Sequence, residues 1–194
     1  TFKVMGGEVT AVLGPSGSGK TTLLRILAGL ERATTGKVVV AGQDISTANE
    51  DQLAIFRRNN LGILFQNFHL IPSMSALENV SLALEIAETG QSIRQIRDQA
   101  AAALEEVGLG DRMTHVPSAL SGGEQQRVAV ARALVLDPAV ILADEPTGNL
   151  DKANSDAVFD LLKAATRKGR QAVVMVTHNA DLAERTDRVV RMED

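Results

Sequence analysis

Short apolar runs alternate along the chain with longer amphipathic stretches, and this alternation predicts its elements. The apolar runs are rich in Val, Ile, Leu and Ala, and their length is that of buried strands rather than helices. They are Glu8–Leu13, Lys37–Ala41, Leu61–Gln66, Ala139–Ala143, Val173–Thr177 and Arg188–Val190. Gly42–Asp44 predicts a turn after the second run. Strands that alternate with helical patterns favour the α/β class of folds.

Helical patterns fill most of the intervals between these runs. Ser75 followed by Glu78 is typical of a helix N-cap with a capping box. The other expected helices are Leu23–Ala28, Asp51–Arg58, Ile93–Val107, Lys152–Thr166 and Asp181–Arg185. Because the interval 67–138 is mostly helical and has strands on either side, we interpret it as a helical subdomain. It would be inserted into an α/β core formed by residues 1–66 and 139–194.

One glycine-rich stretch lies between the first apolar run and a helix. It fits the phosphate-binding pattern GxxxxGK[ST] and consists of Gly14, Pro15, Ser16, Gly17, Ser18, Gly19, Lys20, Thr21 and Thr22. Glycines allow the backbone to curl around an anion, and successive N–H groups at a helix start favour phosphate. We therefore predict that Lys20 reaches the β- and γ-phosphates of a nucleotide and that the Thr21 hydroxyl coordinates Mg²⁺.

Polar side chains follow three other apolar runs, at the point where each run ends. They are Gln66, the pair Asp144 and Glu145, and His178. The carboxyl ends of parallel strands meet at one edge of a sheet, so we expect these side chains to converge beside the glycine-rich loop. Taken singly, each has a structural alternative: Gln66 as a strand-end cap, Asp144 as a helix N-cap and His178 as a packing residue.

Composition narrows the class of protein. The 194 residues suit one domain, and the contents of 44% hydrophobic and 23% charged residues are ordinary for a globular protein. The absence of Cys excludes disulfides and Cys-ligated metals. No apolar run approaches the ~20 residues of a membrane span, and no signal peptide is visible. The net charge of −4 and the lack of a long basic run argue against nucleic acid as a partner.

Both ends of the chain look like interior points of a longer protein. Thr1–Val4 has the pattern of the end of an earlier strand, and the chain stops at Asp194 soon after Arg188–Val190. We therefore expect a single domain that is truncated at both ends.

Several motifs, together with the glycine-rich loop, resemble the nucleotide-binding domain of an ABC transporter. Leu120–Arg127 reads LSGGEQQR and resembles the ABC signature, and Ile141–Thr147 reads ILADEPT and resembles a Walker B strand. Phe65–Gln66, Asn149–Asp151 and Thr177–His178 resemble the Q-loop, the D-loop and the switch histidine. The resemblance covers nearly the whole chain. It implies a P-loop NTPase (RecA-like) core with a mixed, mainly parallel sheet, a small N-terminal antiparallel β part and an inserted helical subdomain.

The same resemblance implies a Mg²⁺-dependent ATP hydrolase, with ATP and Mg²⁺ as its cofactors. Glu145 would orient or deprotonate the attacking water, and His178 would contact the γ-phosphate. Thr21 and Gln66 would complete the Mg²⁺ shell, and Asp144 would hold the ion directly or through water. These roles suit phosphoryl transfer, which needs charge neutralisation and positioning.

A second anion site is implied at the signature motif. Ser121, Gly122, Gly123 and Glu124 stand at a helix start, where a hydroxyl and free amides favour phosphate. In the family this site binds the γ-phosphate of ATP held by another subunit, so a head-to-tail homodimer would enclose two ATP molecules. Asp151 would communicate across that dimer. His69 and His115 lie outside all of these motifs.

The sequence in and around these motifs resembles one subgroup of the family. Phe65–Pro72, Ala76–Val80 and Ala143–Asp151 are similar to the ATPases of lipoprotein-release and macrolide-export type. The resemblance implies a transmembrane permease as partner, peripheral attachment at the cytoplasmic face of the membrane, and contact between the stretch after Gln66 and the coupling helix of the permease. Amino-acid importer ATPases, soluble ABC ATPases that act on ribosomes or DNA, and a nucleotide-sensing module without turnover remain as alternatives.

In this family the aromatic residue that stacks on adenine lies further upstream of the glycine-rich loop than the first residue of this sequence. Phe2 lies too near the loop to take that place. We therefore expect weaker nucleotide binding than a longer domain would show.

Overall fold

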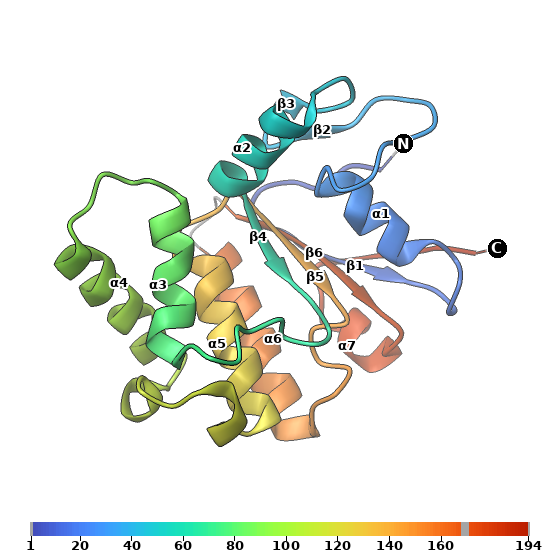
Figure 1. Ribbon diagram of the computed structural model, residues 1–194. Helices are drawn as coiled ribbons and strands as arrows, with labels where there is room; N and C mark the ends of the chain where they lie inside the picture. Colours follow the sequence, from blue (N-terminus) through green and yellow to red (C-terminus); the bar gives the residue numbers. More distant parts are fainter. Residues whose placement is uncertain (1, 168–170, 194) are drawn as a thin grey trace.

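A five-stranded sheet forms the centre of the computed structural model, which describes residues 2–167 and 171–193 (Figure 1). Its strands are β1 (Val9–Leu13), β4 (Leu61–Leu64), β5 (Val140–Asp144), β6 (Ala172–Thr177) and β7 (Arg188–Arg191), in the order β4-β5-β6-β1-β7. Every pairing in this sheet is parallel. Antiparallel pairing is confined, within the described residues, to a separate pair, β2 (Val39–Val40) with β3 (Gln43–Asp44). The α/β class and the small antiparallel part are therefore confirmed.

Alternate residues of the inner strands enter two different cores. Ile141 and Ala143 of β5 pack with residues of α5 (Gly122–Leu134) and α6 (Lys152–Thr166), whereas Leu142 packs with residues of α1 (Lys20–Leu27). Figure 1 shows α1 on one face of the sheet and α5 and α6 on the other. Because successive strand side chains point to opposite faces, a parallel sheet needs this double cover.

The helical segment after β4 packs α3 (Ala76–Ile86) and α4 (Ile93–Glu106) against α5. The expected capping box at Ser75 and Glu78 is confirmed, and Ser92 and Ser121 form the same motif at α4 and α5. The remaining helical elements are α2 (Glu50–Asn60), the 3₁₀ turns Gly110–Arg112 and Pro117–Ala119, and α7 (Ala180–Glu184). None of the described helices has the length and apolar character needed to cross a bilayer. The division into a core and a helical subdomain stays a prediction.

Two expectations about local structure are wrong. Gln43–Asp44 is strand β3 and not a turn, because the reversal is made by Ala41 and Gly42, both at positive φ (50° and 75°). Such a two-residue turn suits the twist of a hairpin, but Ala-Gly is a weak signal for it. Phe2–Val4 is not a strand and packs against the α1 side of the sheet; Thr1 lies outside the described residues.

Strand β4 and helix α5 approach each other closely at Gly62. A Cβ at this position would lie 2.4 Å from the Ala133 carbonyl oxygen and 3.1 Å from Pro138 Cγ. The contact matters for the site because β4 leads to Gln66 while α5 begins at the signature motif.

We predict that Gly62→Ala lowers the free energy of unfolding by about 1–3 kcal/mol, because the added methyl group meets backbone that cannot rotate away. Gly110→Ala is the matched control: its Cβ would meet Glu105 Cγ at 3.5 Å, an ordinary contact. The control should change stability by less than about 0.5 kcal/mol. Urea unfolding measures both, and equal midpoints would contradict the close contact.

Candidate functional site

The carboxyl ends of β1, β6, β5 and β4 lie side by side at one edge of the sheet, and a cavity of about 440 Å³ opens there. The cavity is lined by Ser16, Gly17, Gly19, Lys20, Thr21, Thr22, Gln66, Asp144, Glu145, Val176 and His178. The structure thus brings the glycine-rich loop and the strand-end polar residues to one place, as a parallel sheet requires. Their chemical roles remain predictions.

The glycine-rich loop is shaped for an anion. Gly17 and Gly19 have φ of 91° and 89°, which side-chain-bearing residues adopt only under strain. Gly19 is the N-cap of α1, and the first turn of that helix has no acidic residue. The buried Lys20 ammonium donates to the carbonyl oxygens of Gly14 (2.9 Å) and Pro15 (2.5 Å). An ammonium has three donors, so one remains for a ligand at the helix start.

Oxygen donors suited to a hard cation stand beside the loop. The Thr21 hydroxyl donates to Asp144 Oδ1 at 3.4 Å, and Gln66 lines the same cavity. No three His, Cys, Asp or Glu side chains gather into a metal cluster anywhere in the described ranges. Mg²⁺ commonly binds through one or two protein groups and takes its other ligands from phosphates and water. The donor set at this edge therefore fits Mg²⁺ together with a nucleotide.

Glu145 sits on a strained turn directly after β5. Its φ is 47°, and its N–H donates to the Val176 carbonyl at 3.0 Å while its own carbonyl accepts from Gly148 N–H at 3.1 Å. These two bonds hold the left-handed backbone, which costs energy for a residue with a Cβ. The Glu145 carboxylate is 2.8 Å from His178 Nδ1, and its side chain is only 15% exposed. A carboxylate and an imidazole that both line the cavity are thus paired.

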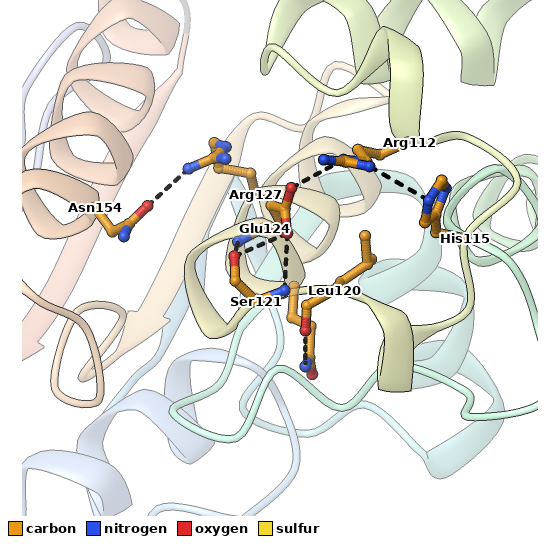
Figure 2. A network of polar contacts seen from close by, with 8 residues as sticks. Arg112, His115, Leu120, Ser121, Glu124, Arg127 and Asn154 are labelled. Carbon is orange, nitrogen blue, oxygen red and sulfur yellow. Dashed lines mark hydrogen bonds and ion pairs between the residues drawn. The ribbon is translucent and has the colours of Figure 1, made fainter.

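The signature residues lie outside this cavity, at the N-terminus of α5 (Figure 2). Glu124 Oε2 accepts from the N–H and the hydroxyl of Ser121, both at 2.8 Å, and Oε1 accepts from Arg112 Nε at 3.2 Å. The bonds from Ser121, with a smaller contribution from Arg112, lower the pKa of Glu124. Ser121, Gly122, Gly123 and Glu124 therefore form a capped helix start that is separate from the glycine-rich loop of the same chain.

Asp151 is tied to that helix through Asn154. It is the N-cap of α6, accepting from the Asn154 N–H and from Asn154 Nδ2, both at 2.9 Å. Bonds from Asn154 lower the pKa of Asp151. Asn154 Oδ1 in turn accepts from Arg127 of α5 at 2.9 Å, as Figure 2 shows. Asp151 thus caps α6, and the same side chain is connected to the signature helix through Asn154.

Sequence reasoning missed other residues that shape this region. The Met192 N–H donates to the Leu13 carbonyl at 2.8 Å, and a Cβ at Gly14 would lie 2.5 Å from the Met192 carbonyl oxygen. Met192 therefore packs against the start of the loop, and nothing in its sequence neighbourhood signals this. Arg127 and Asn154 were missed as well, because their contact joins two helices that are distant in the sequence.

We predict that Gly123→Ala lowers the free energy of unfolding by about 1–3 kcal/mol, because the methyl group displaces Asn154 from its partners Arg127 and Asp151. A Cβ at Gly123 would lie 2.1 Å from Asn154 Oδ1. In the matched control, Gly122→Ala, the nearest atom is Phe68 Cζ at 3.9 Å. That variant should stay within about 0.5 kcal/mol of the parent. Thermal or urea unfolding decides, and equal losses in both variants would refute the contact.

Curated proteins of known sequence resemble the chain along its whole length. The family model described as "ABC transporter" matches residues 1–148. The chain is 45% identical to the macrolide export ATP-binding/permease protein MacB of Rhodopirellula baltica, covering 100% of this chain and 28% of that protein. It is 48% identical to the lipoprotein-releasing system ATP-binding protein LolD of Shewanella denitrificans, covering 97% of this chain and 80% of that protein.

Solved structures of ATP-binding cassettes resemble the fold of this chain over nearly its whole length. A dimeric ATP-binding cassette in a post-hydrolysis state, bound to ADP and Pi, superimposes with a TM-score of 0.91 at 38% identity, covering 99% of this chain and 84% of that one. A second dimeric structure, of a bacterial ABC transporter cassette, gives a TM-score of 0.89 at 39% identity, covering 98% of this chain and 83% of that one.

Proposed function

Because this chain belongs to the ABC transporter family, we propose that it binds ATP with Mg²⁺ at the carboxyl edge of its sheet and that the hydrolysis drives a membrane permease. The observation that carries the proposal is the single cavity into which the glycine-rich loop, Gln66, Asp144, Glu145 and His178 all open. The loop supplies an anion site, the strand ends supply oxygen ligands, and a paired carboxylate supplies a base.

The residues divide the work of phosphoryl transfer to water. Lys20 and the loop amides hold the phosphates, and Thr21, Gln66 and Asp144 hold Mg²⁺. When bound, Mg²⁺ offsets the charge of the phosphates. Glu145 accepts a proton from the attacking water, for which its position inside the cavity and its bond to His178 orient it.

The signature residues at the start of α5 complete the ATP site of a second subunit. Ser121, Gly122, Gly123 and Glu124 stand apart from the glycine-rich loop of their own chain, so their amides and hydroxyl serve ATP held by another copy. The dimeric form of the two solved relatives supports this arrangement. Asp151, connected to α5 through Asn154, lies next to the signature residues and would transmit contact across the dimer.

The partner is a transmembrane permease, with this domain at the cytoplasmic face of the membrane. Identities of 45% and 48% to MacB and LolD support an export or lipoprotein-release system. The stretch that follows Gln66 is the proposed contact for the permease, since it leads from the nucleotide cavity to the helical segment.

We predict that Glu145→Gln reduces ATP hydrolysis by about 100-fold or more, because the amide cannot accept the proton of water. ATP affinity should change little, and a dimer should accumulate with ATP. Phosphate release, equilibrium binding and size-exclusion chromatography measure these three properties. Glu85→Gln, on the exposed side of α3, is the matched control and should behave as the parent. A Glu145→Gln variant as active as the parent would remove the assigned base.

We also predict that chelation of Mg²⁺ by EDTA stops hydrolysis and that added Mg²⁺ restores it. The protein offers no cluster of acidic ligands in its described part, so the ion arrives with ATP. Thr21→Ala should then need a higher Mg²⁺ concentration for half-maximal activity. Undiminished hydrolysis in excess EDTA would show that the ion is not required.

A further inference from the structure

The backbone that follows Gln66 is strained at two successive residues. Phe68 has φ of 59° and His69 has φ of 48°, and neither is glycine. The left-handed conformation costs about 1–2 kcal/mol for each residue with a Cβ. A segment with two such residues persists only where the surrounding structure holds it.

Arg132 of α5 provides that hold. One terminal nitrogen of its guanidinium donates to the His69 carbonyl at 2.7 Å, and the other donates to the Phe68 carbonyl at 2.9 Å. Throughout the described residues, no carboxylate lies within 4.0 Å of Arg132. Burial lowers the pKa of this side chain. A partly buried cation is costly unless hydrogen bonds compensate it, and here the compensating acceptors are these two carbonyls.

The neighbouring contacts also come from the helical segment. The Asn79 side chain in α3 accepts from Ile71 N–H at 2.8 Å and donates to the Met74 carbonyl at 3.0 Å. A Cβ at Gly122, the first residue of α5, would lie 3.9 Å from Phe68 Cζ. Residues 68–74 are thus held by α3 and α5, while Gln66 lines the cavity at the edge of the sheet.

We propose that Arg132 is a positioning residue for Gln66: its two-pronged contact with the Phe68 and His69 carbonyls fixes the strained turn and so fixes where Gln66 enters the nucleotide cavity. The proposal rests on the proposed function of Gln66 as a Mg²⁺ ligand. It gives α5 two tasks, because the helix carries the signature residues at its start and holds the Gln66 segment through Arg132, near its end. A shift of the N-terminal end of α5, which carries the signature residues, would therefore move Gln66 in the nucleotide cavity.

A planar guanidinium is needed for this contact. Two parallel N–H groups match two neighbouring carbonyls, whereas a lysine ammonium is a point donor that cannot reproduce the fork. Arg132→Lys keeps the charge and removes the geometry, and Arg132→Met removes both. Arg94→Met, on the exposed face of α4 where Arg94 pairs with Asp98, is the matched control.

Hydrogen–deuterium exchange of the nucleotide-free protein tests the contact without relying on activity. Loss of hydrogen bonds to a charged donor should speed exchange in peptides spanning residues 67–73 by about tenfold or more in Arg132→Lys and Arg132→Met. Exchange in the loop 14–22 should be unchanged, as should all peptides in Arg94→Met. If Arg132→Met fails to fold, Arg132→Lys alone decides.

Steady-state kinetics tests the positioning role. Misplacement of Gln66 should lower kcat by about 10- to 100-fold and raise the Mg²⁺ concentration for half-maximal activity, while the KM for ATP changes less than about twofold. Unchanged exchange at 67–73 would overturn the proposal. So would faster local exchange with unaltered kcat and Mg²⁺ dependence, or a uniform rise in exchange across the chain, which marks a merely structural role. A parent protein without ATPase activity would instead overturn the proposed function, leaving the exchange result to show Arg132 as a structural contact only.

Discussion

The register of the parallel sheet is the constraint on which the site depends. Leu13 of β1 pairs with Thr177 of β6, and Val176 pairs with Asp144 of β5. The residues that follow these strands therefore emerge at one level, which places the loop, His178 and Glu145 together. A slip of one residue would turn the side chains of a strand to the opposite face of the sheet. It would also shift the end of that strand relative to its neighbours. The two apolar cores prevent the slip, because alternate strand residues are matched to different helices.

Helix α5 is the second organising element, and it works through single contacts. It touches β4 where Gly62 leaves room for the Ala133 carbonyl, and it reaches α6 through Arg127 and Asn154. It also reaches the backbone after Gln66 through Arg132. Two of these contacts, with β4 and with the backbone after Gln66, join the helix to segments on either side of a residue that lines the cavity. The helix that presents the signature residues thus also holds the segments on either side of Gln66, which lines the cavity.

The parts of this structure that were predictable from the sequence are those set by local chemistry. A phosphate loop needs glycines at positive φ and a helix directly after it, and both requirements can be read at Gly17, Gly19 and Lys20. The α6 bounds, Lys152–Thr166, were likewise predictable from helical periodicity. Arg132, Asn154 and Met192 were not, because Arg132 and Met192 contact residues far away in the sequence, as Asn154 does through Arg127. The signal for Arg132 was present as a charge within an apolar stretch of α5, but periodicity alone treats such a residue as solvent-exposed.

The start of α5 combines a capping box with the proposed second phosphate site, and charge governs both. Glu124 caps the helix and keeps its carboxylate ionised through bonds from Ser121, with Arg112 beside it. A carboxylate near a helix N-terminus is stabilising, yet it occupies the donors that a phosphate would use. In the proposed dimer, a phosphate at this end would compete with Glu124 for the Ser121 hydroxyl. Arg112 already offsets the charge of the Glu124 carboxylate, so a phosphate at this end would meet less negative charge. The capping box uses the N–H groups of Ser121 and Glu124, so those of Gly122 and Gly123 could serve the proposed second site without breaking it.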